Sequence, residues 1–500
     1  MNNVIDIAHF SDLGSKRSLH RTDVVDMRKT DAGTARPPRL SEVAAFAASM
    51  AHGWDDDADR SVTLEPGTAA AAGDHRTRLS AAFSGRPIVV GSGTAPVRSN
   101  DTYYDFRPDS DFLWLTGCPV EDAVLVMRPA GGEHDATVYL PEPARPGDAA
   151  FFNSAVHGEL WVGPAPGVAD WSQALGLEVR PAAELTGALA GLREPLLTRS
   201  AETAITTRYA GYRWRASTEL AGTLAELRMV KDAWEIDRLR DAVDRTVEGF
   251  GAVVEEIPAA VRGGGERWLQ GTFDRYARTH GNGPGYATIV GSGKHAPTLH
   301  WVRCDGPVAS DDLLLLDMGV ETRSFYTADV TRTFPAAGGF SPAQRQVHDL
   351  VERAHLAGLA AVGPGRPFTD FHHACMEVIA RGLHDWDLLP VSVDEALSPE
   401  GQHHRRYLVC GVGHHLGLDV HDCARAGEEA YYCARMAPGM VITVEPGLYF
   451  HAHDLTVPPE LRGIGVRIED DVLVTPDGSD VLSDKLPVDA PGLEQWMRVR

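Results

Sequence analysis

LLLLDMGVETRSFYTADVTRTF, residues 313–334, carries the pattern that decides the fold of the C-terminal half of the chain. An apolar run of strand-forming length ends at Asp317, and a second strand-like stretch contains Asp329. An ionised carboxylate in an apolar site needs a hydrogen-bonding or charged partner, or else it takes up a proton. The pattern therefore predicts that partners for both aspartates come from elsewhere in the chain.

Two further acids occupy comparable positions. Glu445 closes MVITVE (440–445), and Glu469 lies in GVRIEDDVLV (465–474), where alternation places it on the same face as Arg467. Taken singly, each acid is more often a strand end that reaches solvent. If the four converge, however, each pair at about 4 Å repels by roughly 4 kcal/mol at an effective dielectric constant near 20. Two divalent cations would balance four carboxylates and one arginine would not, so the set predicts a dinuclear metal site.

The segment CGVGHHLGLDVHD (410–422) offers nitrogen ligands to the same site. Its glycines allow the backbone to approach a ligand closely, and its histidines are His414, His415 and His421. A histidine would be the natural fifth ligand, although a single histidine in such a segment is more often structural. Oxygen and nitrogen ligands without thiolate favour manganese, cobalt, iron or zinc. We therefore expect two divalent ions, with Mn²⁺ as the first choice and Co²⁺ or Zn²⁺ as alternatives.

Composition excludes several other classes of protein. The chain carries 47 basic and 70 acidic side chains, a formal charge of −23, which argues against nucleic-acid and anionic-membrane partners. Six cysteines without a CxxC pair indicate free thiols in a reducing compartment. Because the N-terminus lacks a secretory pattern and no apolar run approaches the roughly 20 residues of a spanning helix, we expect a cytoplasmic protein.

Five hundred residues predict two domains. Residues 1–75 are polar and are expected to form a flexible lead-in with one short helix near SEVAAFAASM. Residues 76–225 contain the β-like runs PIVV, FLWLTG, AVLVM and TVYL, followed by helical stretches, as in an α/β domain. Residues 226–500 should form the second domain, so the expected class is α/β (α+β).

An amphipathic helix is predicted to open the second domain at residues 228–250. Apolar residues recur there at spacings of three and four. They are Ile236, Leu239, Val243, Val247 and Phe250.

Together these motifs resemble the Xaa-Pro aminopeptidase (aminopeptidase P) and prolidase branch of the "pita-bread" metallopeptidases. LLLLDMG, YTADVTRTFP, GVGHHLGLDVHD, MVITVEPGLY and GIGVRIEDD occur in the family's order within about residues 228–475. FRPDSDFLWLTG (106–117) is similar to the N-terminal domain of this branch. The resemblance implies a creatinase-like α/β domain, then a pita-bread catalytic domain, and a homodimer or homotetramer.

The resemblance also implies a role for each candidate residue. The metal ligands are expected to be Asp317, Asp329, His414, Glu445 and Glu469, with Asp329 and Glu469 bridging both ions. His415 is expected only to pack. The catalytic residues are expected to be His300 in GSGKHAPTLHW, His421 and Glu445, the last as proton shuttle. The residues expected beside the substrate are Tyr449, Arg467 and Cys410, where Cys410 stands at a position commonly occupied by histidine in the family.

The resemblance implies hydrolysis of the bond between an N-terminal residue and a following proline. Water between two divalent ions can ionise near neutral pH, which would supply the hydroxide for this reaction. The alternatives are a prolidase-like Xaa-Pro dipeptidase, or a specialised or catalytically silent member of the family, which the departure at Cys410 keeps open. A metal-ligand role for Cys410 is a further, less favoured alternative. GSGKH (291–295) fails the phosphate-loop pattern, and neither GxSxG nor HExxH occurs.

Overall fold

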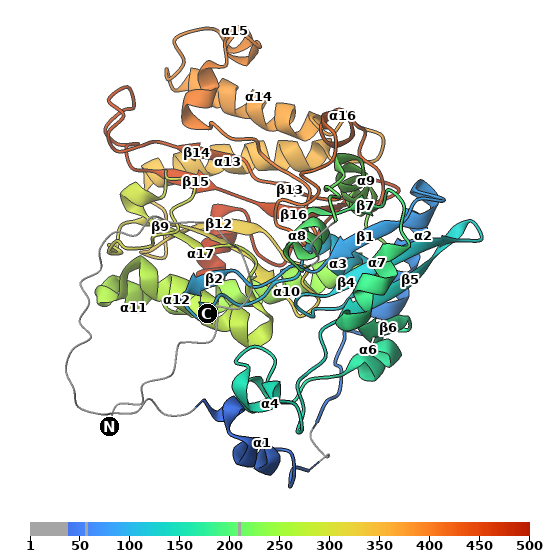
Figure 1. Cartoon of the computed structure of the whole chain (residues 1–500). Helices are drawn as coiled ribbons and strands as arrows, with labels where there is room; N and C mark the ends of the chain where they lie inside the picture. Colours follow the sequence, from blue (N-terminus) through green and yellow to red (C-terminus); the bar gives the residue numbers. More distant parts are fainter. Residues whose placement is uncertain (1–38, 56–58, 209–211) are drawn as a thin grey trace, which may run out of the picture.

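The computed structural model describes residues 39–55, 59–208 and 212–500 (Figure 1). Most of the expected lead-in, residues 1–38, lies outside these described residues. The short helix expected near SEVAAFAASM is present as α1 (Ala44–Met50). Helix α2 (Thr68–Ala82) begins before residue 75 and buries Ala71, Ala72 and His75, so the last part of the expected lead-in belongs to a packed helix.

The N-terminal part is built around a five-stranded sheet in the order β6-β5-β4-β1-β7. Strand β1 pairs antiparallel with β4 and parallel with β7, while β5 pairs antiparallel with β4 and parallel with β6. The strands are β1 (Ile88–Gly91), β4 (Val124–Ala130), β5 (Glu133–Leu140), β6 (Glu178–Pro181) and β7 (Leu196–Leu197), and a separate hairpin joins β2 (Val97–Ser99) to β3 (Thr102–Tyr103). The accompanying helices are α3 (Ser110–Thr116), α4 (Ala150–Asn153), α5 (Glu159–Val162), α6 (Val168–Leu175), α7 (Leu185–Ala190) and α8 (Arg199–Arg208).

Three of the four β-like runs in this part are strands, and the fourth prediction is wrong. PIVV, AVLVM and TVYL fall on β1, β4 and β5, whereas FLWLTG forms most of α3. Asp109 begins this helix, because its side chain accepts hydrogen bonds from the backbone N–H groups of Asp111 and Phe112. All seven residues of α3 are buried, and a short, fully buried apolar run does not reveal whether it is helix or strand.

The amphipathic helix predicted at residues 228–250 is shifted toward the C-terminus. Helix α9 (Thr218–Met229) occupies the first two residues of the predicted range, and α10 (Ala233–Glu255) begins after Asp232. Asp232 accepts a hydrogen bond from the Glu235 backbone, and the Glu235 side chain accepts one from the Asp232 backbone, which forms a capping box. The predicted apolar face packs inward, with Leu239, Val243, Val247 and Phe250 buried and Ile236 partly buried.

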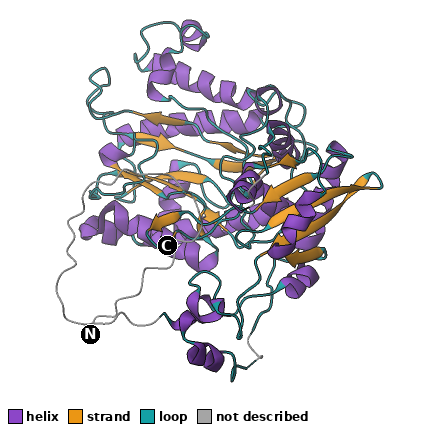
Figure 2. Ribbon diagram, viewed as in Figure 1, coloured by secondary structure: helices purple, strands orange, loops and turns teal. Residues whose placement is uncertain are grey.

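The C-terminal part is a set of antiparallel strands between two layers of helices (Figures 1 and 2). Helices α13 and α14 cover one side, and α10 and α12 lie on the other. The strands form the orders β12-β10-β9 and β13-β16-β17 and the pairs β14-β15 and β11-β8. The expected α/β (α+β) class is therefore confirmed.

The bounds of these elements are as follows. The strands are β8 (Gly283–Pro284), β9 (Ile289–Ser292), β10 (Leu313–Met318), β11 (Val320–Glu321), β12 (Val330–Pro335), β13 (Val441–Val444), β14 (Gly447–Tyr449), β15 (Gly465–Arg467), β16 (Asp470–Val474) and β17 (Ser479–Val481). The helices are α11 (Ile257–Ala259), α12 (Gly265–His280), α13 (Pro342–Ala361), α14 (Asp370–Asp385), α15 (Val393–Leu397), α16 (Glu428–Tyr431) and α17 (Ala490–Arg498). Among the described residues, none of the helices has the length and apolar character needed to span a bilayer.

The stretch GVRIEDDVLV, predicted as one strand, is two. Strand β15 ends at Arg467 and pairs with β14, and β16 begins at Asp470 and pairs with β13. Between them, Glu469 makes an isolated bridge to Thr331 in β12. Because the strand is interrupted at 468–469, residues 465–470 pair with three different strands, β14, β12 and β13. Glu469 lies where these three meet.

Candidate metal centre and active site

Strand pairing brings the four predicted acids together. Asp317 in β10 lies opposite Thr331 in β12, two residues beyond Asp329. Thr331 also pairs with Glu469, and Val444, the residue before Glu445, lies opposite Asp470. The convergence that charge patterning predicted is therefore present in the tertiary structure.

His414 points its free ring nitrogen at this cluster. Its Nε2 atom lies 3.4 Å from Asp329 Oδ2 and 3.7 Å from Glu445 Oε1. On the other side of the ring, Nδ1 lies 3.1 Å from the carbonyl oxygen of His415. Asp329, His414 and Glu469 each offer a ligand atom within 4.8 Å of the others. This group has the composition and spacing of a metal site.

Asp317 is held by two hydrogen-bond donors. Tyr286 Oη donates to Asp317 Oδ1 at 2.6 Å, and Arg467 Nη2 donates to Asp317 Oδ2. Arg467 also donates to Thr331 Oγ1 at 3.1 Å and to Tyr449 Oη at 3.0 Å. The sequence analysis placed Arg467 and Tyr449 here but missed Tyr286, because no local pattern connects position 286 with the acids.

Thr331 was missed in the same way. Its hydroxyl donates to Glu469 Oε2 at 2.7 Å while accepting from Arg467. The sequence did contain a signal for Thr331. On a strand, a residue two positions after Asp329 lies on the same face as Asp329. Alternation along TADVTRTF therefore identifies Thr331 as a second polar side chain directed at the site.

Without cations, the electrostatics of the cluster favour bound protons. Burial raises the pKa of Glu445 to about 7, although His414 and Arg467 partly offset it. Burial, together with Asp329 and Glu445, raises the pKa of Glu469 well above its ordinary value. Burial lowers the pKa of His414, but Asp329 and Glu445 outweigh this and raise it to about 9.

The donor set fits divalent cations. Four carboxylates and an imidazole supply only oxygen and nitrogen, and the charge of the acids exceeds that of Arg467 and a protonated His414 together. Bound divalent ions would replace the protons and relieve the repulsion, as Mn²⁺, Co²⁺ and Zn²⁺ can with such ligands. The residues therefore form a candidate dinuclear metal site.

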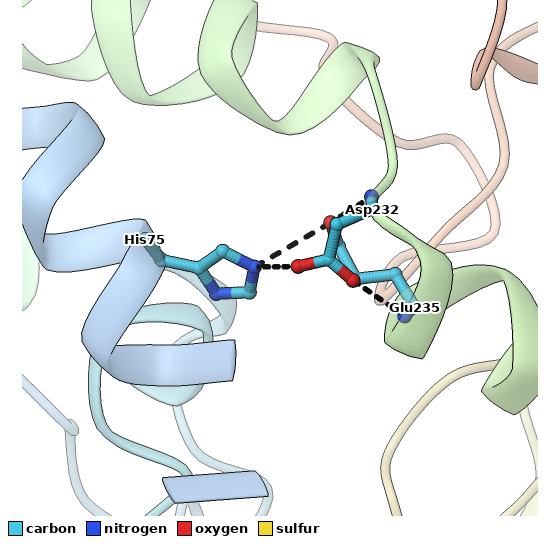
Figure 3. A group of neighbouring side chains, drawn as sticks. All are labelled: His75, Asp232 and Glu235. Atoms are coloured by element: carbon cyan, nitrogen blue, oxygen red, sulfur yellow. Dashed lines mark hydrogen bonds and ion pairs between the residues drawn. The ribbon is translucent and has the colours of Figure 1, made fainter. Parts of the chain in front are cut away.

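A second group of side chains with metal-binding spacing, His75, Asp232 and Glu235, forms a hydrogen-bond network in which no carboxylate oxygen is left without a donor (Figure 3). His75 of α2 points at the carboxylates of Asp232 and Glu235, with Nε2 at 2.9 Å and 3.5 Å. Glu235 already accepts hydrogen bonds from Trp114 Nε1, from Tyr326 Oη and from the Asp232 backbone, and Asp232 accepts one from the Glu235 backbone. Each carboxylate oxygen therefore has a donor, and a metal ion would have to displace these.

A third grouping, His348, Asp349 and Glu352, lies along a single helix, α13. The Asp349 carboxylate already pairs with Arg345 Nε at 2.6 Å. A guanidinium therefore holds the position that a cation would need.

The candidate metal centre forms one wall of a cavity of about 980 Å³. The remaining walls are largely apolar and include Ile289, Leu299, Val302, Val420, Tyr431 and Tyr432. The predicted catalytic residues His300 and His421 both line this cavity, and the ring of His421 lies edge-on to that of His414 with centroids 4.5 Å apart. A peptide end could therefore contact the acids, the two histidines and an apolar surface together.

The three residues expected beside the substrate differ in position. Arg467 and Cys410 line the cavity, whereas Tyr449 is buried behind Arg467. Burial and the nearby Glu445 raise the pKa of the Cys410 thiol, which keeps it neutral. His415 is buried and stacks on Phe368, as expected of a packing residue.

Comparison with known proteins assigns the chain to a family. The sequence profile of metallopeptidase family M24 matches residues 237–476, and that of the aminopeptidase P N-terminal domain matches residues 73–196. Xaa-Pro aminopeptidase 2 of Streptomyces coelicolor is 47% identical over 469 residues, which cover 92% of this chain and 97% of the relative. The chain belongs to metallopeptidase family M24. Like other M24 metallopeptidases, it is a hydrolase.

Solved M24 structures share the fold. The aminopeptidase PepP of Pseudomonas aeruginosa superposes with a TM-score of 0.75 at 28% identity, covering 88% of this chain and 99% of the other. Zinc-substituted Escherichia coli aminopeptidase P in complex with product gives 0.75 at 27% identity, with the same coverage. The creatinase-like N-terminal domain and pita-bread catalytic domain that the sequence implied are confirmed by these matches.

Glu445 is expected to contribute a loss of stability to the metal-free protein as the pH rises from about 4.5 to about 7, against the opposite contribution of buried histidines such as His348 and His415, whose pKa burial lowers. The folded state raises the pKa of Glu445 from 4.5 to about 7, so in this window the folded chain keeps a proton that the unfolded chain releases. The loss is on the order of 3 kcal/mol. With chelator present, the melting temperature of the parent chain minus that of Glu445→Gln should fall across this range, and Mn²⁺ should remove the fall because bound ions favour the ionised acid.

Glu445→Gln is the matched control for this prediction, since glutamine does not titrate. Its metal-free melting temperature should therefore rise more, or fall less, than that of the parent chain over the same window. An equal slope in the variant and the parent chain would show that Glu445 is not the group responsible.

Proposed function

We propose that this M24 metallopeptidase is an Xaa-Pro aminopeptidase, which hydrolyses the bond between an N-terminal residue and a following proline. The observation that carries the proposal is the convergence of the four acids and His414 in the wall of a cavity that also holds His300 and His421. The 47% identity to the Streptomyces coelicolor Xaa-Pro aminopeptidase, over nearly the whole chain, supports the substrate class.

Asp317, Asp329, His414, Glu445 and Glu469 would hold two divalent ions, with Mn²⁺ as the first candidate and Co²⁺ or Zn²⁺ as alternatives. Asp329 and Glu469 each offer a ligand atom within 4.8 Å of the other and of a His414 ring nitrogen, so these three residues would hold an ion together. Bound divalent ions supply Lewis acidity toward the scissile carbonyl and lower the pKa of water.

Glu445 is the residue suited to move the proton. Hydrolysis forms a C–O bond from water to the carbonyl carbon and breaks the C–N bond to proline. One proton of the water must reach the departing proline nitrogen, and the Glu445 carboxylate, in the wall of the cavity beside the other expected ligands, is placed to take it up and release it. The products are a free amino acid and a peptide that begins with proline.

His300 and His421 are suited to orient the substrate. Burial and the neighbouring His414 lower the pKa of His421, so its ring is neutral near pH 7 and can donate one hydrogen bond to the oxygen that becomes negative. An amide to proline has no N–H group, so the apolar walls need not provide an acceptor for it. Arg467 and Cys410 would complete the pocket beside the metal ligands, with Tyr449 supporting Arg467 from behind.

The expected domain division, oligomeric state and cellular location belong to the same proposal. We place the domain division near residue 225, with an N-terminal domain over 76–225, which α2 extends to residue 68, and the catalytic domain over 226–500. A homodimer or homotetramer is expected from the family. A cytoplasmic location fits the six cysteines, all of which are free.

The test is a peptide panel applied to the Mn²⁺-loaded chain. The first residue should be released from Xaa-Pro-Yaa tripeptides and not from Xaa-Ala-Yaa controls. Cleavage of Xaa-Pro dipeptides alone would identify a prolidase-like dipeptidase. Less than one equivalent of bound metal after loading, with all peptides intact, would indicate a catalytically silent protein.

A further inference from the structure

A buried ionic network joins the N-terminal domain to the segment that carries His421. Its centre is Arg228, near the end of α9, whose side chain is buried. The guanidinium donates to Asp111 Oδ1 in α3 at 2.7 Å, to Asp419 Oδ2 at 3.0 Å and to Asp422 Oδ1. One side chain therefore binds three carboxylates, two of which flank His421.

Both ends of the segment 419–422 are held by additional contacts. Asp422 accepts a hydrogen bond from Lys231 Nζ at 3.1 Å, and its backbone N–H donates to the His415 carbonyl at 2.9 Å. Asp419 accepts a hydrogen bond from Ser110 Oγ of the N-terminal domain at 2.6 Å. The backbone on each side of His421 is thus fixed by side chains from other parts of the fold.

The ionic contacts are needed to hold the segment 419–422 in place, because side-chain packing does not fill the space beside it. A polar cavity of about 280 Å³ lies between the domains and is lined by Asp111, Arg228, Asp419 and His421, among others. His421 therefore borders this cavity as well as the larger one that contains the metal ligands. If the ionic contacts were lost, the segment would have room to move and the His421 ring would lose its place beside His414.

The ion pair between Arg228 and Asp422, at the centre of the network, is charged at neutral pH. Burial alone would raise the pKa of Asp422, but Arg228 and Lys231 outweigh it and hold the pKa at about 2. The same carboxylates, with Asp422 foremost, outweigh the effect of burial on Arg228 and raise its pKa well above its ordinary value. This ion pair therefore does not titrate near neutral pH and acts as a permanent support.

We propose that Arg228 and Asp111 are positioning residues for His421, so that docking of the N-terminal domain sets the place of a substrate-orienting histidine in the catalytic domain. The inference rests on the role proposed above for His421. It assigns the N-terminal domain a part in turnover through a defined contact.

The test is a double-mutant cycle of Asp111→Asn and His421→Ala in the full-length, Mn²⁺-loaded chain, assayed on an Xaa-Pro-Yaa tripeptide. Asp111→Asn alone is expected to lower kcat by about 10-fold with a change in KM of about twofold or less, because a small displacement of an orienting group costs turnover. In the His421→Ala background the same substitution should have almost no further effect on kcat. The number of bound metal equivalents should stay the same throughout.

His75→Gln is the matched control, because it breaks a different buried contact between the N-terminal domain and the catalytic domain (Figure 3). It is expected to lower the melting temperature as Asp111→Asn does. Its effect on kcat should be small and equal in both backgrounds. Arg228→Lys, which keeps the charge but cannot reach three carboxylates at once, should give a kcat between those of the parent chain and Arg228→Met.

Hydrogen exchange provides a measurement that does not depend on activity. Backbone amides of 419–422 should exchange faster in Asp111→Asn and remain protected in His75→Gln. If Asp111→Asn does not fold, Asp419→Asn, at a half-exposed position, replaces it in both experiments. Unchanged protection of this segment, or an equal loss of kcat in both backgrounds, would overturn the inference. Failure of the parent chain to cleave the tripeptide would instead contradict the proposed function.

Discussion

Asp329→Asn is expected to lower kcat/KM on an Xaa-Pro-Yaa peptide by about 10³-fold, the scale on which a single electrostatic partner of a reacting centre acts. Asp329 belongs to the group with His414 and Glu469 in which every ligand atom lies within 4.8 Å of the others. Asparagine keeps the shape but removes the charge and one metal-binding oxygen. Metal analysis of the purified variant should show fewer bound equivalents than the parent chain.

Asp385→Asn is the control for this substitution, because its side chain is 79% exposed at the end of α14. It should retain full activity and full metal content. The assignment of Asp329 as a ligand would be refuted if Asp329→Asn bound two equivalents of Mn²⁺ with the affinity of the parent chain.

Arg467→Met is expected to lower the free energy of unfolding of the metal-free protein by about 3–5 kcal/mol, because removing one partner leaves the other charge buried and unpaired. Arg467 donates to Asp317, Thr331 and Tyr449 from a position that is only 3% exposed. In the Mn²⁺-loaded protein the loss should be smaller, since the ions then neutralise Asp317. Urea unfolding with and without metal measures both values.

Arg381→Met gives the comparison for a surface arginine. Arg381 pairs with Glu377 on α14, with both side chains more than half exposed, and such pairs contribute about 0.5 kcal/mol or less. A loss for Arg467→Met as small as that for Arg381→Met would contradict the structural role of Arg467. An equal loss with and without Mn²⁺ would show that the ions do not compensate Asp317.

Predictions of secondary structure were correct where the spacing or position of apolar residues distinguishes a helix from a strand. The apolar run at 313–316, followed by Asp317, is β10, and the helical spacing from Leu239 to Phe250 is the buried face of α10. The prediction failed at FLWLTG, because a short, wholly apolar segment has no alternation to read. The structure makes it a helix through the cap that Asp109 provides.

The sequence by itself indicated which acids could form a site if the fold brought them together, and the family resemblance added His414. Each of the four acids lies at or next to a strand, and together they carry more negative charge than protein cations can balance. If the acids converge, charge balance therefore favours divalent cations. The identity of the ligand atoms, carboxylate oxygen and imidazole nitrogen, followed from residue type alone.

Only the tertiary structure decided how those residues are supported. Arg467 reaches Asp317 across 150 positions of sequence, and Arg228 reaches Asp111 across 117 and Asp422 across 194. No period of two or 3.6 residues encodes such a contact, because the partners meet only after separate elements have packed. Local periodicity fixes which face of an element is buried, whereas the partner of a buried charge depends on the element that packs against that face.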